Sequence, residues 1–98
     1  MSSVYVARVK EVAARMIGDE MLILSARTSK LFSLNETAAA IWQAADGTTE
    51  LSDIVGQKIC PQFEVDHGSA LRDARELVDG LARHGVMHVS AMPITGVA

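Results

Sequence analysis

The segment from Lys30 to Trp42, KLFSLNETAAAIW, changes its side-chain pattern at Asn35. Before Asn35 the residues alternate as in a β-strand, with Phe32 and Leu34 on the same face. After Asn35 they form an alanine-rich apolar stretch with helical spacing. Asparagine is favourable as a helix N-cap, because its side-chain oxygen can accept a hydrogen bond from an early backbone N–H. The segment therefore predicts a strand that leads directly into a helix.

Two further strands are predicted upstream of this junction. Val12–Ile17 and Glu20–Ser25 flank Gly18 and Asp19, a pair typical of a tight hairpin turn, because glycine tolerates positive φ angles. A shorter stretch at Tyr5–Val9 indicates one more strand. Three short antiparallel strands with one covered face form a plausible unit, whereas an isolated hairpin is only marginally stable.

Three helices are predicted after the junction. The first begins at Asn35, and the second starts near Leu51 and is expected to end at Pro61, which lacks the N–H that a helix interior needs. The third runs from about Asp66 to His84, with an apolar stripe along one side and glycine as its stop. The following segment, VMHVS, predicts a short extended tail.

A run of strands followed by a run of helices favours a segregated α+β fold. We therefore predict a winged-helix-turn-helix-like α+β domain, in which a three-stranded antiparallel sheet is followed by three helices. The 98 residues are enough for one domain. Residues 1–98 are accordingly predicted to form a single domain, with a flexible tail at about 90–98.

The distribution of charge argues against nucleic acid as a partner. The net charge is −3; five basic and three acidic residues precede Asn35, and four basic and nine acidic residues follow from there. Acidic helices are poorly suited to binding a phosphate backbone.

The single cysteine, Cys60, cannot form an internal disulfide and suits a reducing compartment. With no run of apolar residues that resembles a signal peptide or a membrane span, a cytoplasmic location without membrane contact is predicted.

The sequence shows no recognisable catalytic or metal-binding motif. His84 and His88 are four residues apart, but Gly85 lies between them, and Cys60 is remote in sequence. These spacings do not match a zinc site. The carboxylates are interpreted as solvated surface groups, and the glycines are scattered rather than gathered in a phosphate-binding loop. We therefore predict no catalytic residue, no metal and no cofactor, and favour binding over catalysis.

Three kinds of binding remain open at this point. A winged-helix module could bind DNA, but the third helix carries acids interleaved with its arginines. The third strand could instead expose an edge that an extended peptide completes as a further strand, with Leu31 supplying a pocket. A structural dimer could also use that edge. From composition and periodicity alone, the simplest interpretation is that the protein's own helix or a second copy covers Leu31.

The ordered combination of several short motifs resembles the PqqD family. The motifs are a strand-turn-strand that leads into LNETAAAIW, the dipeptide DG, a short helix around DIV, the crossing FEVD, and a final helix that closes at HGV. The similar region runs from about Val12 to Val86, which is most of the chain. The residues before the third strand depart from the family: members devoted to pyrroloquinoline quinone (PQQ) synthesis carry PE there, and this chain has ARTSK. The departure puts that specific pathway in doubt.

The resemblance implies a non-catalytic peptide chaperone with a winged-helix-like fold. Such domains bind the leader of a ribosomally synthesised and post-translationally modified peptide (RiPP) precursor, and present it to a modifying enzyme, often a radical S-adenosylmethionine enzyme. The leader is held as a strand added beside the third strand, in a groove walled by the third helix. The implied peptide-binding residues are Lys30, Leu31, Phe32 and Ser33 on the strand, and Leu71, Arg75 and Val78 on the helix. Arg75 is available to a leader carboxylate, and a homodimer is a further expectation.

Overall fold

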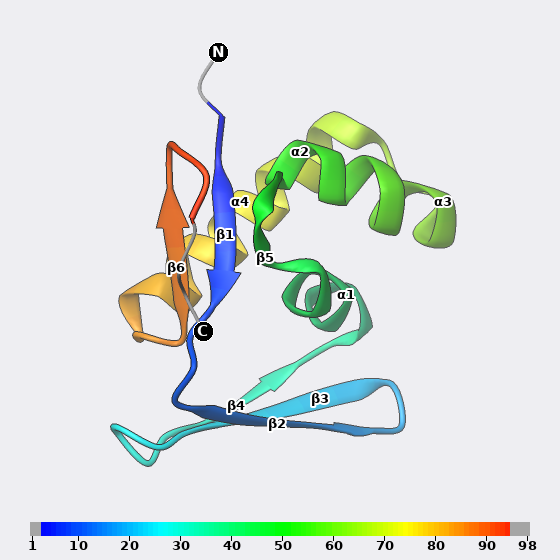
Figure 1. Ribbon diagram of the computed structural model, residues 1–98. Helices are drawn as coiled ribbons and strands as arrows, with labels where there is room; N and C mark the ends of the chain where they lie inside the picture. Colours follow the sequence, from blue (N-terminus) through cyan, green and yellow to red (C-terminus); the bar gives the residue numbers. More distant parts are fainter. Residues whose placement is uncertain (1–2, 95–98) are drawn as a thin grey trace.

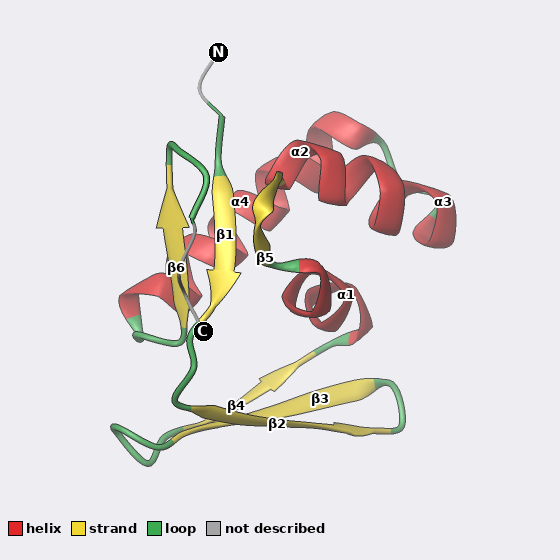
Figure 2. Cartoon of the chain, in the orientation of Figure 1, coloured by secondary structure: helices red, strands yellow, loops and turns green. Residues whose placement is uncertain are grey.

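The computed structural model describes residues 3–94, which form two three-stranded antiparallel sheets and a set of helices (Figures 1 and 2). The mixed α+β class is therefore confirmed, while the prediction of one sheet is wrong. The elements, in chain order, are β1 (Tyr5–Arg8), β2 (Val12–Ile17), β3 (Glu20–Ser25), β4 (Leu31–Leu34), α1 (Glu36–Ala44), β5 (Asp46–Glu50), α2 (Leu51–Ile54), η1 (Val55–Ile59), α3 (Cys60–Phe63), α4 (His67–Arg83) and β6 (Met87–Ser90).

The predicted hairpin and third strand form one of the sheets, in the order β2-β3-β4. Gly18 has a φ of 63° in the turn between β2 and β3, as a tight hairpin requires. Along β3 the side chains of Met21 and Ile23 are buried, while Leu24 is exposed. This alternation places one face of the sheet on the core, below α1 in Figure 1.

The second sheet, in the order β5-β1-β6, joins segments from both ends and the middle of the chain (Figure 1). Strand β1 pairs with β6 from Tyr5 opposite Ser90 to Arg8 opposite Met87. The N-terminal strand was predicted from periodicity to precede the hairpin, but it does not join the hairpin's sheet. Such pairing between distant segments depends on tertiary packing, which a local pattern of side chains does not reveal.

The junction between β4 and α1 agrees with its prediction. The Oδ1 atom of Asn35 accepts a hydrogen bond from the N–H of Ala38 at 2.9 Å, which caps the helix. At the other end of α1, the guanidinium of Arg8 in β1 donates to the carbonyls of Trp42 and Gln43. A cation there satisfies carbonyls that have no partner within the helix, and it complements the helix dipole. The two contacts fix α1 between the sheets.

The second helical region differs from its prediction, because it continues through Pro61. The backbone of Val55–Ile59 forms a π-helical turn, in which the N–H of Cys60 donates to the carbonyl of Val55. Pro61 follows this π-helical turn at the start of α3, so the proline lies where the hydrogen-bond spacing changes and not inside a regular α-helix. The helical path therefore reaches Phe63, and the three segments α2, η1 and α3 form one continuous arm (Figure 2).

Helix α4 has the predicted bounds, and the predicted extended tail is β6. The N-cap of α4, Asp66, accepts a hydrogen bond from the N–H of Ser69 at 3.0 Å. Gly85, with a φ of 75°, follows the end of α4. After β6 the chain turns back, and the N–H of Ile94 donates to the carbonyl of Gly47 in β5 at 2.7 Å. The flexible tail predicted at 90–98 extends past Ile94 into 95–98, which lie outside the described residues.

The core lies between the two sheets and the helices and is apolar. Its largest completely buried side chains come from both sheets, from the helical arm, from α4 and from the segment between α4 and β6; they are Ile23, Leu51, Ile54, Ile59, Val6, Val55, Val78 and Val86. Within residues 3–94, no helix is long and apolar enough to cross a membrane.

Asp46 organises the start of β5, and its pKa gives a testable pH dependence. The backbone N–H groups of Thr48 and Thr49 both donate to its Oδ1 at 2.9 Å, and the hydroxyl of Thr49 donates to Oδ2. These bonds, led by the one from the Thr48 backbone, lower the pKa of Asp46 below its ordinary value. The charged carboxylate therefore stabilises the fold above the unfolded pKa of about 3.9 and loses this effect as the pH falls through the folded pKa.

We expect Asp46→Asn to be less stable than the wild type at pH 6, and the gap to shrink as the pH falls to about 3. Urea unfolding followed by circular dichroism at several pH values measures this gap. The two proteins differ only at residue 46, so the difference between their stabilities isolates this side chain. A gap that stays constant down to pH 3 contradicts the proposed role of its charge.

Candidate functional site

The free edge of β4 is the first feature that could receive a ligand. In the sheet order β2-β3-β4, β4 pairs with β3 and has no other strand partner among residues 3–94. The N–H of Ser25 donates to the carbonyl of Lys30 at 3.0 Å, and the next opposed pair is Leu24 with Leu31. Because hydrogen-bonded and non-hydrogen-bonded pairs alternate in an antiparallel ladder, the N–H and C=O groups of Leu31 and Ser33 point away from β3. These four groups are available to an additional strand.

The side chains of β4 lie on two faces, as the alternation predicted. Leu34 is buried and Phe32 is half-buried against the core, where its ring lies 5.2 Å from the ring of His84 at the end of α4. Leu31 is 64% exposed on the outer face, across from Leu24. Ser33 also faces outward, and its hydroxyl donates to Oε1 of Glu20 at 3.3 Å. The edge therefore separates an apolar inner face from a mixed outer face.

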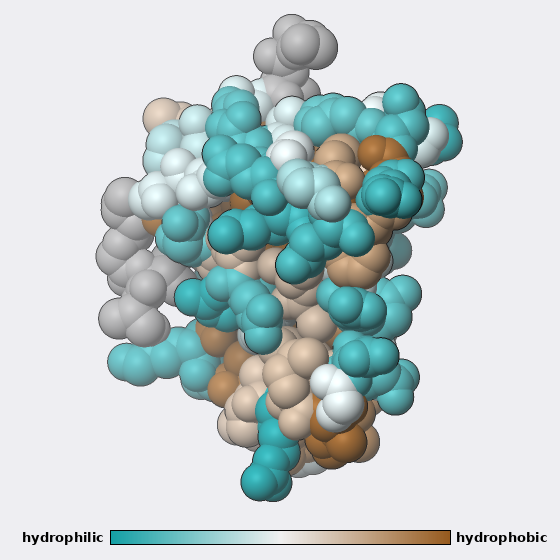
Figure 3. Space-filling model, turned by 90° about the vertical axis from the view of Figure 1, so that its right-hand side faces the viewer, coloured by the Kyte–Doolittle hydropathy of each residue, from teal (hydrophilic) through white to brown (hydrophobic). Residues whose placement is uncertain are grey.

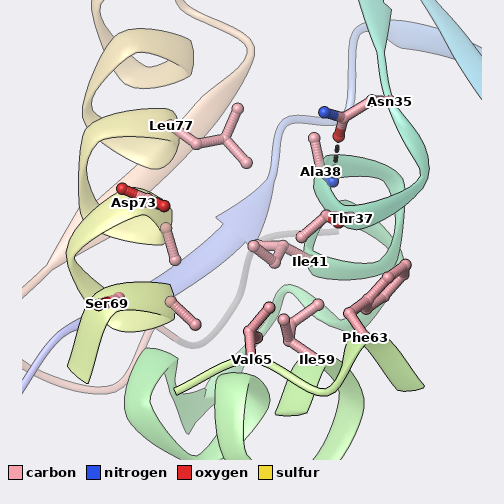
Figure 4. Close-up of a pocket in the computed structure, with 12 residues that line it drawn as sticks. Asn35, Thr37, Ala38, Ile41, Ile59, Phe63, Val65, Ser69, Asp73 and Leu77 are labelled. Atoms are coloured by element: carbon pink, nitrogen blue, oxygen red, sulfur yellow. Dashed lines mark hydrogen bonds between the residues drawn. The ribbon is translucent and has the colours of Figure 1, made fainter. Parts of the chain in front are cut away.

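A cavity of about 350 Å³ lies next to the end of β4, between α1 and α4. Figure 4 shows α4 on one side, α1 on the other, and the segment around Val65 across the bottom. Its lining comes from α1 and the residue before it, from the helical arm and the loop after it, and from α4; the lining residues are Asn35, Thr37, Ala38, Ile41, Ile59, Phe63, Val65, Ser69, Ala70, Asp73, Ala74 and Leu77. Asn35 belongs both to the end of the strand edge and to the cavity, so the two features are adjacent.

One flank of α4 faces the cavity and α1, and it carries none of the three helix residues predicted to contact the peptide. Asp73 and Leu77 line the cavity, and His84 contacts Phe32. Successive residues of an α-helix are about 100° apart, so Arg75 projects from the opposite flank to Asp73. Arg75 is exposed but does not line the cavity.

The three predicted helix residues lie outside the cavity. Val78 has no exposed surface and packs in the core, where a bound peptide cannot reach it. Leu71 is half-buried against the core and, like Arg75, is not part of the cavity wall. Of the predicted strand residues, Lys30 is exposed just before β4, and Leu31, Phe32 and Ser33 form the edge itself.

The cavity has one signal in the sequence that the predictions above did not include. Small side chains gather on one side of α4, where Ala70 and Ala74 are four residues apart and Ser69 precedes them, and all three line the cavity. Small residues on the face of a helix leave space beside it, whereas Leu71 and Val78 fill their surroundings. Which flank meets α1 depends on how the helices cross, and this cannot be read from one helix alone.

The surface that carries the β2–β3 hairpin is also apolar. Figure 3 shows brown and tan atoms gathered at the lower end of the molecule, where this hairpin lies, below a mostly polar upper half. Met16 is 43% exposed and Ile17 is 56% exposed. The sheet β2-β3-β4 is thus bounded by apolar surface at the hairpin as well as at Leu31.

Nothing in residues 3–94 gathers into a metal site of three or more histidine, cysteine, aspartate or glutamate side chains. Nε2 of His67 lies 3.0 Å from the carbonyl oxygen of Ser52, a contact that joins the start of α4 to α2. His84 packs against Phe32, and Cys60, the first residue of α3, is half-buried against the core. His67, His84 and Cys60 thus each contact or pack against other parts of the fold.

Comparison with known proteins agrees with this architecture. A structure of TbiB1 in complex with the TbiA(beta) leader peptide matches with a TM-score of 0.75 and 26% sequence identity, over 84% of this chain and 94% of that one. A lasso peptide synthetase B1 complexed with the leader peptide matches with a TM-score of 0.73 and 26% identity, over 85% and 96% of the two chains. A comparison with curated proteins gave no significant match.

The fold and the site define a small α+β domain with an open strand edge beside an apolar cavity. The sequence matches the family described as Coenzyme PQQ synthesis protein D (PqqD) over residues 20–87, and the chain belongs to this family. The fold is also that of the PqqD truncation of Methylobacterium extorquens PqqCD, a stand-alone RiPP recognition element, with a TM-score of 0.68 and 20% identity over 88% of each chain.

Proposed function

We propose that this protein binds the leader of a ribosomally made precursor peptide as a strand added to β4, and presents it to a peptide-modifying enzyme. The observation that carries the proposal is the free edge of β4, with the N–H and C=O groups of Leu31 and Ser33 pointing outward. An extended peptide can complete this ladder, and backbone hydrogen bonds of this kind supply affinity with little dependence on sequence.

The cavity supports the same function. A peptide strand beside β4 places alternate side chains on the inner side of the sheet, where Phe32 and Leu34 face the core. The cavity begins at Asn35, directly after β4, and offers a site for a side chain of that strand. The strand edge would bind the backbone and the cavity would select the side chain.

The two structural neighbours at 26% identity add independent support, because both are bound to leader peptides. Each of them is covered almost completely by this chain, at 94% and 96% of its length. We therefore assign to this protein the role of a recognition domain that is not itself catalytic, with a winged-helix-like arrangement of α1, the helical arm and α4 beside the hairpin. The cytoplasm, where precursor peptides are made, is its proposed location.

A DNA-binding role is not favoured. Helix α4, the expected recognition helix, carries Arg72, Arg75 and Arg83 together with Asp73, Glu76 and Asp79. A helix that enters the major groove presents basic or amide side chains to bases and phosphates, and interleaved acids oppose this. Retention on duplex DNA at low salt would be the observation in favour of it.

The test is a titration of the labelled leader half of a short precursor encoded beside this gene, followed by fluorescence anisotropy. We expect a dissociation constant of micromolar order or tighter, and no binding of the core half of the same precursor. Amide hydrogen exchange measured by NMR identifies the edge: Leu31 and Ser33 should gain protection on binding, whereas Phe32, already paired with Ile23, should change little. No binding at tens of micromolar would remove the proposal.

A further inference from the structure

The cavity between α1 and α4 combines an apolar interior with a polar rim. Ile41, Ile59, Phe63 and Leu77 supply large apolar side chains to its lining, as Figure 4 shows. The polar groups come from Asn35 and Thr37 on one side and from Ser69 and Asp73 on α4. A side chain that enters this space must therefore be apolar along most of its length.

Asp73 is the one ionisable side chain among the described residues that line the cavity. Its carboxylate takes part in none of the side-chain hydrogen bonds formed within residues 3–94. By contrast, the Asn35 oxygen is already engaged by the N–H of Ala38. Asp73 is thus an exposed acceptor at the rim that is free to meet a ligand.

The charges around Asp73 strengthen its preference for a cation. Glu76 lies three residues further along α4, which places it on a neighbouring part of the helix surface. Two arginines of α4 are also near in sequence, but neither lines the cavity: Arg72 is about 100° away around the helix, and Arg75 projects from the opposite flank. From Asn35 onward the chain carries nine acidic and four basic residues. An acidic side chain would therefore be repelled at this rim, and a purely apolar one would gain nothing from the carboxylate, which stays hydrated.

We propose that the cavity binds a lysine or arginine side chain of the leader peptide, with its aliphatic stem among Ile41, Ile59 and Leu77 and its charged end on the carboxylate of Asp73. The inference rests on the proposed function and specifies which leader residue the site selects. Long basic side chains are suited to such a site, because they bury an apolar stem while their charge stays near water. A charged donor paired with a carboxylate also makes a stronger hydrogen bond than a neutral donor does.

The probe is a library of random 12-residue peptides, displayed on phage and selected on the immobilised full-length protein. We expect the selected peptides to share a lysine or arginine at one fixed position within an otherwise extended, apolar pattern. Selection on Asp73→Asn should relax this position to long neutral side chains, and selection on Asp73→Lys should favour glutamate or aspartate there. Asp53→Asn changes the net charge by the same amount as Asp73→Asn but lies on α2 outside the cavity, so it should select the wild-type motif.

A synthetic peptide from the selection gives the size of the effect. Replacing its conserved lysine with norleucine keeps the stem and removes the charge, and should weaken binding to the wild type about three- to tenfold, as for an ion pair at a partly exposed rim. With Asp73→Asn the two peptides should bind equally. Selected peptides without a fixed basic position, or a lysine preference that survives in Asp73→Asn, would overturn this inference and leave the leader-binding function intact. If neither a library peptide nor a leader binds, both this inference and the proposed function are contradicted.

Discussion

Replacing Leu31 with proline is expected to weaken leader binding about tenfold or more while the protein stays folded. The backbone N–H of Leu31 points away from β3, so its loss removes a bond to the added strand and none to the sheet. A carbonyl of the peptide then lies beside the edge without a donor, which costs roughly 1–3 kcal/mol of binding free energy. Anisotropy titration with the leader measures the effect, and circular dichroism checks the fold.

Two variants separate the backbone of this edge from other effects of the substitution. Leu31→Ala keeps the N–H and should retain most of the affinity, because the side chain lies on the outer face. Ala14→Pro makes the same change on β2, the opposite edge of the sheet, where the pairing register also points the N–H of Ala14 away from β3. It should leave binding unchanged. If Ala14→Pro abolishes binding and Leu31→Pro does not, the leader uses β2 instead.

Replacing Trp42 with alanine is expected to lower the free energy of unfolding by about 3–5 kcal/mol. Trp42 is 3% exposed and lies in α1, the helix that supports the β4 junction and one side of the cavity. Because small domains have only about 5–15 kcal/mol of stability in total, much of the variant is expected to be unfolded near body temperature. Since Trp42 is the sole tryptophan, urea unfolding must be followed by circular dichroism rather than by fluorescence.

The neighbouring residue supplies the matched control for this variant. Gln43 is exposed in the same helical turn, so Gln43→Ala should change the free energy of unfolding by no more than about 0.5 kcal/mol. A loss of less than about 1 kcal/mol for Trp42→Ala would contradict the central position of α1 in the core.

The local features of this fold could be predicted from the sequence, because each depends on a few adjacent residues. The turn at Gly18, the alternation along β4 and the cap at Asn35 all depend on interactions within a few residues. The ends of α4 follow from Asp66 and Gly85 for the same reason. Helix capping and tight turns involve short-range hydrogen bonds and backbone sterics, which act before the tertiary structure is complete.

The features that were missed depend on contacts between distant segments. The sheet β5-β1-β6 brings Tyr5 opposite both Glu50 and Ser90, and no local pattern specifies those partners. The π-helical turn that accommodates Pro61 changes the hydrogen-bond spacing by one residue, which the apolar periodicity did not reveal. For the site, the apolar stripe of α4 was predicted, but the cavity between α1 and α4 was not, because Asp73 lines it only through the way the two helices pack.

The free edge of β4 also bears on how the protein behaves at high concentration when no leader is present. Unpaired strand edges are sites of edge-to-edge association, and long, flat, uncharged edges are the most hazardous. Here the edge is only four residues long, Lys30 stands at one end of it, and Ser33 holds a hydrogen bond to Glu20 on its outer face. A short edge flanked by a positive charge can pair with a leader peptide, but it offers few backbone hydrogen bonds to a second copy of the protein. The surface proposed to recognise the leader therefore also limits self-association.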